Sequence, residues 1–111
     1  MMKSLLRASK AVALAIVILF AVALPSRAQN DGASVYKTKC AICHGADGKG
    51  DTGMGKSMKL RDLGSADVQK QTDDELIAIT TNGKGKMPAY KGKLTDAQIK
   101  ELVTFVRSLK K

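Results

Sequence analysis

The residues with the clearest chemistry stand together in the segment Cys40-Ala41-Ile42-Cys43-His44, a C-x-x-C-H motif. On a helix, side chains three and four positions apart share one face, so the two thiols and the imidazole lie on the same side. Two thiols at this spacing can bond to one side of a haem, and the imidazole can reach the iron under the ring. The motif therefore predicts one covalently attached c-type haem, with His44 as an iron ligand.

The same side chains have two other possible uses. A zinc site needs three or four ligands, and with one His and two Cys in the chain, carboxylates would have to supply the rest. A dithiol or disulfide between Cys40 and Cys43 is the second interpretation, because an oxidising compartment favours it. The βαβ pattern that normally surrounds a redox C-x-x-C is absent from the sequence. Haem is the better supported interpretation, and the disulfide stays open as the alternative.

The far face of the iron raises the question of a second ligand. His44 is the only histidine, so a second imidazole from this chain is excluded. Beyond the first 28 residues, the thioether candidates are Met54, Met58 and Met87. Met87 precedes Pro88, which restricts Met87 to extended conformations and favours presentation of its sulfur to the iron. We predict Met87 as the ligand; its alternative role is to fill a gap in the core, which we expect of the other two methionines.

The first 28 residues have the composition of an export signal. They carry four basic residues and no acidic one, and an apolar run spans residues 11–24. That run suits a secretory signal and falls short of the ~20 residues of a membrane span. Pro25 ends the run, and Ser26-Arg27-Ala28 forms a small-x-small cleavage site. We expect residues 1–28 to be a cleaved signal peptide and the mature protein to be periplasmic; an uncleaved anchor is the alternative.

The remaining residues, 29–111, are expected to form one small domain with a thin core. Without the leader the net charge falls from +9 to +5, and all ten glycines lie in this part. A chain of this size buries only ~60–65% of its unfolded surface and often needs a disulfide, a metal or a cofactor. Multi-domain enzymes, coiled coils and polytopic membrane proteins are excluded.

The elements that must position the motif are helices. Apolar spacing and capping patterns predict helices over residues 32–44, 66–70, 73–82 and 96–109. Thr72 and Thr95 each begin a capping box, and Gly83 ends the third helix. Two loops rich in glycine, residues 45–64 and 83–93, connect them, and a loop as long as the first usually has a function. No strand is predicted, so the expected class is all-α.

In this order the elements resemble a class I cytochrome c, specifically the small bacterial monohaem type related to cytochrome c6 and c551. The resemblance covers essentially all of residues 29–111. In that family the first and last helices meet through a Gly and an aromatic residue against an apolar and an aromatic residue. The matching residues here are Gly32, Tyr36, Leu102 and Phe105. The resemblance implies three to four helices around one haem, axial ligands His44 and Met87, and thioether bonds at Cys40 and Cys43.

One departure from the family concerns the partner of the proximal histidine. Relatives often use the carbonyl of a proline after the motif to accept the imidazole N–H. Here the comparable stretch is Leu60-Arg61-Asp62-Leu63, which contains no proline. We therefore expect a different backbone carbonyl near this stretch to accept the proton of His44.

An iron held by His and Met on its two faces has no open site, so the expected function is one-electron transfer between redox partners rather than enzymatic catalysis. Thioether ligation and burial both raise the reduction potential. Apolar residues expected to wall the haem pocket are Leu60, Leu63, Leu76, Ile79, Leu94 and Val103. Tyr90 is expected either to reach a haem propionate or to pack at the surface.

The two loops expected to border the haem are strongly basic, with Lys49, Lys56, Lys59, Lys84, Lys86, Lys91 and Lys93. They are interpreted either as a solvated surface or as a patch that steers the protein onto an acidic redox partner in a respiratory chain. No nucleic acid or small-molecule substrate is expected, and membranes are expected only through partner complexes or an uncleaved leader. The alternative function is a small haem peroxidase or ligand-binding sensor with an open distal site; a thiol–disulfide protein without haem is the third hypothesis.

Overall fold

The computed structural model describes residues 31–111, so the predicted leader lies outside the described residues. The helices of the described part are α2 (Gly32–Lys39), α3 (Ala41–His44), α4 (Gly53–Ser57), α5 (Ala66–Gln69), α6 (Asp73–Asn82) and α7 (Asp96–Ser108). No strand forms between 31 and 111; two isolated bridges, Lys84 with Met87 and Lys91 with Leu94, are the only β pairing there. The predicted all-α class is confirmed, with three long helices and three short ones in place of three to four.

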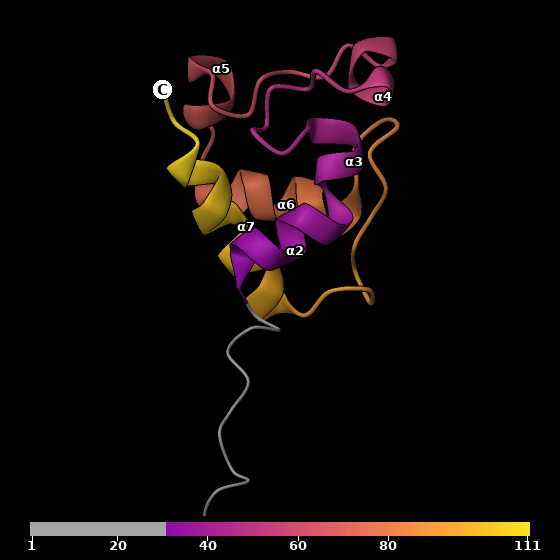
Figure 1. The fold of residues 1–111 in the computed structure, drawn as a ribbon. Helices are drawn as coiled ribbons and strands as arrows, with labels where there is room; N and C mark the ends of the chain where they lie inside the picture. Colours follow the sequence, from indigo (N-terminus) through magenta and orange to yellow (C-terminus); the bar gives the residue numbers. More distant parts are fainter. Residues whose placement is uncertain (1–30) are drawn as a thin grey trace, which may run out of the picture.

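The crossing of α2 and α7 forms the base of the domain (Figure 1). Gly32 lies so close to α7 that a Cβ atom there would be 2.1 Å from the carbonyl oxygen of Glu101. One turn later the ring of Tyr36 packs on that of Phe105, with 4.7 Å between the ring centroids. The contact predicted between the first and last helices is therefore present, and it depends on a residue without a side chain.

The two predicted capping boxes are confirmed. The Thr72 hydroxyl accepts a hydrogen bond from the N–H of Glu75, whose carboxylate accepts from the N–H of Thr72. Thr95 and Gln98 make the same reciprocal pair at the start of α7. Each box satisfies two N–H groups that a helix start leaves without partners, which is why the sequence located both starts correctly.

Two local predictions were wrong. The helix predicted over residues 32–44 is interrupted at Cys40, whose φ of −114° departs from helical geometry and separates α2 from α3. The predicted loop 45–64 contains α4, although glycine disfavours helix. Thr52 caps α4, its hydroxyl accepting from the Gly55 N–H at 2.8 Å, and close packing around Gly55 holds the turn.

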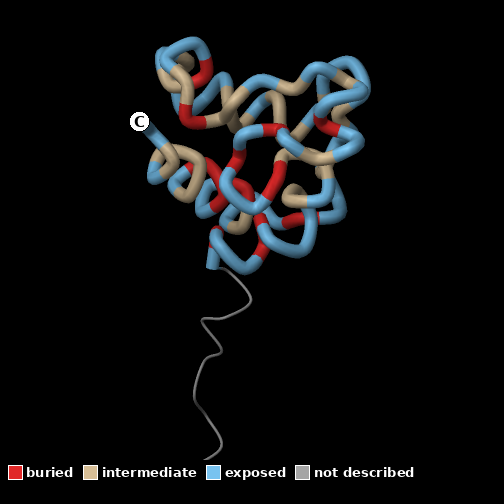
Figure 2. Tube along the Cα trace, turned by 45° about the horizontal axis from the view of Figure 1, so that its top comes forward, coloured by how far each residue is buried: buried red, intermediate tan, exposed pale blue. Residues whose placement is uncertain are grey.

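The core is small and lies mainly where α2 meets α7. Its main cluster of buried residues consists of Val35, Tyr36, Leu94, Ile99 and Leu102. Figure 2 shows many of the buried stretches in the middle of the domain and others in the outer coils, while much of the outer trace is exposed. Among the described residues, no helix combines the length and apolar character needed to cross a membrane.

Candidate haem-attachment site

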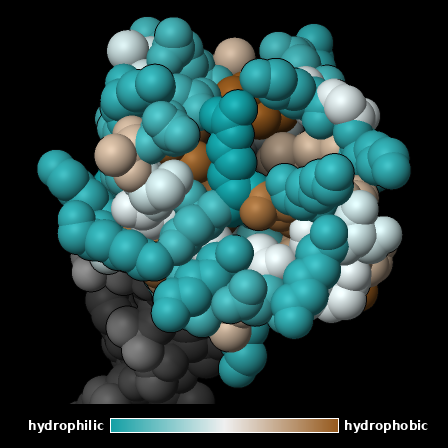
Figure 3. All heavy atoms as spheres, turned by 90° about the horizontal axis from the view of Figure 1, so that it is seen from above, coloured by the Kyte–Doolittle hydropathy of each residue, from teal (hydrophilic) through white to brown (hydrophobic). Residues whose placement is uncertain are grey.

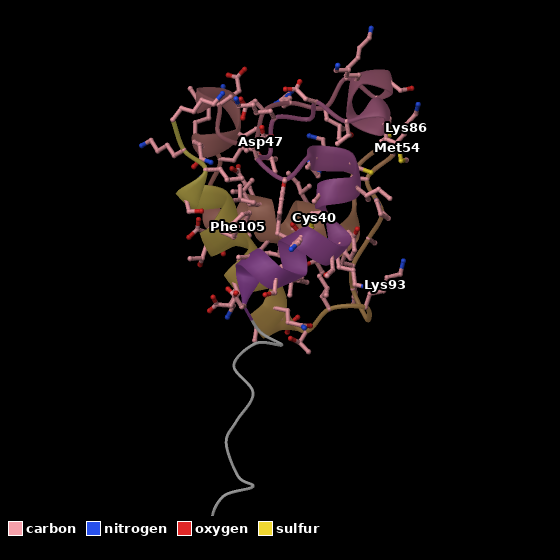
Figure 4. All side chains as sticks on the ribbon, in the orientation of Figure 1. Cys40, Asp47, Met54, Lys86, Lys93 and Phe105 are labelled. Carbon is pink, nitrogen blue, oxygen red and sulfur yellow. The ribbon has the colours of Figure 1, made fainter. Side chains whose placement is uncertain are left out.

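The motif residues lie at the centre of the domain, at the break between α2 and α3. Cys40 occupies the break, and Cys43 and His44 end the four-residue helix α3. Figure 4 shows Cys40 in the interior, whereas Lys86 and Lys93 extend from the edge. Both cysteines are free thiols and half-buried.

Two adjoining cavities open onto these side chains. The smaller one has a volume of about 90 Å³, and the larger one has about 330 Å³. The residues that line both are Cys40, His44, Ile79 and Met87. The larger volume falls within the ~300–1,000 Å³ of ligand pockets in proteins. The two thiols and the imidazole of the motif thus line the same cavity as Met87, the predicted second ligand.

Apolar side chains from four parts of the chain form most of the cavity walls. Of the predicted wall residues, Leu63, Leu76 and Val103 line the smaller cavity, Leu60 lines the larger one and Ile79 lines both. Leu94 was predicted as a wall but lines neither cavity; it is 8% exposed and packs in the core cluster instead. In Figure 3 brown hydrophobic residues show between the long hydrophilic side chains of the face seen from above.

The imidazole of His44 is prepared to act as a neutral ligand. Burial lowers the pKa of His44 below its usual value of 6.5, because the charged form is poorly solvated there. Its Nδ1 atom is buried and makes no hydrogen bond within the described residues. The carbonyl acceptor predicted near residues 60–63 is therefore not present. The lowered pKa keeps the ring neutral, which is the form of imidazole that binds a metal.

The thiol of Cys40 is unsuited to start disulfide exchange. Burial raises the pKa of Cys40 to about 11, with a further contribution from the adjacent Cys43. Redox-active C-x-x-C pairs instead have a thiolate with a lowered pKa. The environment of Cys40 therefore fits a thiol that bonds to a buried apolar group better than it fits a reactive nucleophile.

The loop after α6 brings Met87 to both cavities. Lys84 and Met87 exchange two backbone hydrogen bonds of 3.1 and 3.0 Å, closing a tight turn. Gly83 has a φ of +76°, and a Cβ there would lie 2.7 Å from the Met87 carbonyl oxygen. The other two methionines differ: Met58 lines the larger cavity with Met87, whereas Met54 is 51% exposed. Of the three candidates, Met87 alone reaches both cavities.

The basic residues predicted near the haem are only partly at the site. Lys84 and Lys86 line the larger cavity, and so does Lys39, which was not among the predicted group. The other five loop lysines line neither cavity. Tyr90 also lines the larger cavity, and its hydroxyl donates to the carbonyl of Lys39 at 3.1 Å.

The sequence did not indicate the role of two hydroxyl groups beside the motif, those of Tyr36 and Thr52. The hydroxyl of Tyr36 donates to the carbonyl of Gly45 at 2.6 Å, and that of Thr52 donates to the carbonyl of Cys43 at 2.7 Å. Each bond joins residues nine positions apart, and nothing in the local sequence pattern indicated either one.

Comparisons with known proteins agree with this geometry. Residues 27–106 match the family described as cytochrome C oxidase, cbb3-type, subunit III. Cytochrome c6 of Leptolyngbya boryana is 40% identical over 75 residues, which cover 68% of this chain and 85% of that protein. Cytochrome c6 of Nostoc sp. is 36% identical over 89 residues, 78% of each chain.

Two further similarities extend this result. The cbb3-type cytochrome c oxidase subunit FixPc of Rhizobium leguminosarum is 39% identical over 80 residues, which cover 70% of this chain and 26% of that subunit. A solved structure titled KustC0563 c-type cytochrome has a TM-score of 0.68 and 36% identity, covering 73% of this chain and 99% of its own. The chain belongs to the family of c-type cytochromes that includes cytochrome c6 and the cytochrome domain of cbb3-type oxidase subunit III.

Proposed function

We propose that this chain is a periplasmic monohaem cytochrome c that carries one electron at a time between redox proteins. In this proposal Cys40 and Cys43 would hold the haem covalently, and His44 and Met87 would be the ligands of its iron. The mature domain is residues 29–111, and residues 1–28 are the cleaved leader. The convergence of the four side chains on two adjoining apolar cavities is the observation that carries the proposal.

The chain's own residues give this site its behaviour. When bound, a haem iron supplies a one-electron couple between the ferric and ferrous states. With both His44 and Met87 as iron ligands, no position would remain for a substrate, which separates electron transfer from catalysis. The apolar walls, such as Leu76 and Ile79, exclude water and so favour the ferrous centre, which carries one positive charge fewer. The methionine sulfur favours the same state.

The proposed partners are redox proteins with an acidic docking face. Lys39, Lys84 and Lys86 line the larger cavity, so positive charge borders one of the two cavities that would hold the cofactor. Charge complementarity at such an edge speeds encounter and gives weak, salt-sensitive contacts. The oxidase subunit among the relatives suggests a respiratory chain as the setting.

The test is carbon monoxide binding and reduction potential in three proteins: the wild type, Met87→Ala and Met58→Ala. We expect the ferrous wild type to bind carbon monoxide slowly, because Met87 blocks the iron. Met87→Ala should bind it rapidly and have a lower potential, since the thioether is lost. Met58→Ala is the matched control, because Met58 lines the same cavity, and should resemble the wild type.

Rapid carbon monoxide binding by the wild type, equal to that of Met87→Ala, would contradict the proposal. It would favour the alternative function, a small haem peroxidase or ligand-binding sensor with an open distal site. A reversal of the two variants would reassign the distal ligand to Met58 and retain the electron carrier.

A further inference from the structure

Three successive backbone carbonyls at the end of the motif are all held from outside it. The carbonyl of Cys43 accepts from the Thr52 hydroxyl at 2.7 Å, and that of His44 accepts from the N–H of Gly50 at 2.7 Å. The carbonyl of Gly45 accepts from the Tyr36 hydroxyl at 2.6 Å. The last carbonyls of a helix have no partners within it, so these bonds complete the end of α3.

Both hydroxyl groups are themselves fixed in place. Tyr36 is 2% exposed and packs on Phe105. Burial raises the pKa of Tyr36 to about 12, so its hydroxyl remains a donor throughout the ordinary pH range. The Thr52 hydroxyl donates to Cys43 and also accepts from the N–H of Gly55, which sets its direction at both ends.

The backbone beside the motif is closely packed. A Cβ on Gly55 would lie 2.7 Å from the Cys43 carbonyl and 2.3 Å from the carbonyl of Gly50. Gly45 has a φ of +83°, a conformation that favours glycine. The backbone on either side of His44 is therefore constrained, whereas the ring nitrogen Nδ1 makes no hydrogen bond within the described residues.

We propose that the hydroxyls of Tyr36 and Thr52 are positioning groups that set the orientation of the His44 imidazole through the backbone on either side of it. In proteins that bind a metal through histidine, the second ring nitrogen usually donates to a neighbour and fixes the ring. Here the ring has no such bond, so its direction depends on the backbone that carries it. This inference rests on the proposed function, in which that imidazole binds the iron.

The experiment compares haem-loaded Tyr36→Phe and Thr52→Val with the wild type. Each variant removes one hydroxyl and keeps the shape of the side chain. The haem-methyl NMR shifts and the EPR g values of the ferric protein report the orientation of the axial imidazole. We expect both sets of values to change, and the Gly50 amide, which donates to the His44 carbonyl, to exchange up to roughly tenfold faster.

Two controls separate positioning from a general loss of stability. Thr52→Ser keeps the hydroxyl and should restore the wild-type spectra. Thr104→Val removes a hydroxyl that donates to the carbonyl of Lys100 at 3.2 Å on the exposed surface of α7, and should leave the spectra unchanged.

Wild-type spectra in both Tyr36→Phe and Thr52→Val would overturn the inference, even if both variants were less stable, because the hydroxyls would then be structural only. Failure of the wild type to attach haem would overturn the proposed function instead. If either variant does not fold, the spectra of Thr52→Ser decide: they match the wild type if the hydroxyl positions the ring, and a difference contradicts this.

Discussion

The two sides of this domain are completed in different ways. Where α2 crosses α7, protein atoms fill the space: Gly32 touches the backbone of α7, and Ile99 is 1% exposed. On the other side, α6 is equally regular and well capped, yet none of its residues is buried. Its apolar residues Leu76 and Ile79 line cavities instead.

This difference indicates which side of the domain needs a cofactor to complete its packing. A domain of this size makes a thin core, and small domains often add a cofactor or a cross-link to reach a stable fold. Leu76 and Ile79 have the pattern of core residues but line the cavities beside the thiols and imidazole of the motif, whereas Ile77 of the same helix packs against the core. The cavity side is the part that a flat apolar group would complete.

Removing a side chain from the packed side should have the largest effect on stability. Ile99→Ala should lower the free energy of unfolding by about 2–5 kcal/mol, because a cavity replaces a fully buried side chain. Ile42→Ala is the matched control: Ile42 lies inside the motif but is 71% exposed, so its change should stay within about 0.5 kcal/mol. Denaturant unfolding measures both, and equal losses would contradict the comparison.

Adding one methyl group where α2 crosses α7 should lower the free energy of unfolding almost as much as Ile99→Ala does. Gly32→Ala would place a Cβ 2.1 Å from the Glu101 carbonyl, and the helices can relieve this only by separating. We expect a loss of about 1–3 kcal/mol, against the ~0.5–1 kcal/mol gain that alanine normally brings in a helix. Gly53→Ala is the control, since a Cβ there meets nothing within 4 Å. A Gly32→Ala variant as stable as Gly53→Ala in thermal melts would show that the crossing is loosely packed.

Charge reversal on the cavity side should change the rate of electron transfer rather than the stability of the fold. In Lys84→Glu/Lys86→Glu, oxidation of the ferrous protein by ferricyanide, an anion, should slow by about 3–10-fold at low salt. The difference should shrink as salt is added, because exposed charges are screened. Lys110→Glu is the control, a lysine that lines neither cavity. Stopped-flow mixing measures the oxidation rates. Equal slowing in the control would show that the lysines at the cavity affect the rate no more than other surface lysines do.

The smallest effect concerns a surface ion pair. A hydrogen bond from Lys111, followed by one from the Gly64 N–H, lowers the pKa of Asp62 below its usual 3.8. The folded state therefore gains stability from ionised Asp62 above that value and loses it as pH falls through the lowered pKa. The advantage of the wild type over Asp62→Asn in melting temperature should be small at neutral pH and vanish at low pH. An advantage that is the same at pH 7 and in strong acid would contradict this account.

The sequence predicted features that depend on local hydrogen bonds or on one short motif. Thr72 and Thr95 start α6 and α7 as predicted, because a capping box is complete within four residues. The sequence missed features that depend on contacts between distant segments. Leu94 has the character of a wall residue, but only the packing of the folded chain places it in the core.

At the site, too, local features were predicted and contacts between distant segments were missed. The motif and Met87 were predicted as a site from residue types, spacing and one proline, and in the structure all four side chains line the larger cavity. The break at Cys40 was missed because helical spacing continues across it. The hydroxyls of Tyr36 and Thr52 were missed because they donate to backbone carbonyls. Every residue has such a carbonyl, so the sequence does not show which one accepts.

The most direct test of the central claim, that a covalent haem completes the cavity side, is an intact mass. The protein would be purified from the periplasm of a host with haem-attachment machinery, beside a Cys40→Ser/Cys43→Ser variant. The account predicts the mass of the chain plus one haem for the wild type and the mass of the chain alone for the variant. A wild-type mass without haem and two hydrogens lower, from a disulfide between Cys40 and Cys43, would contradict it.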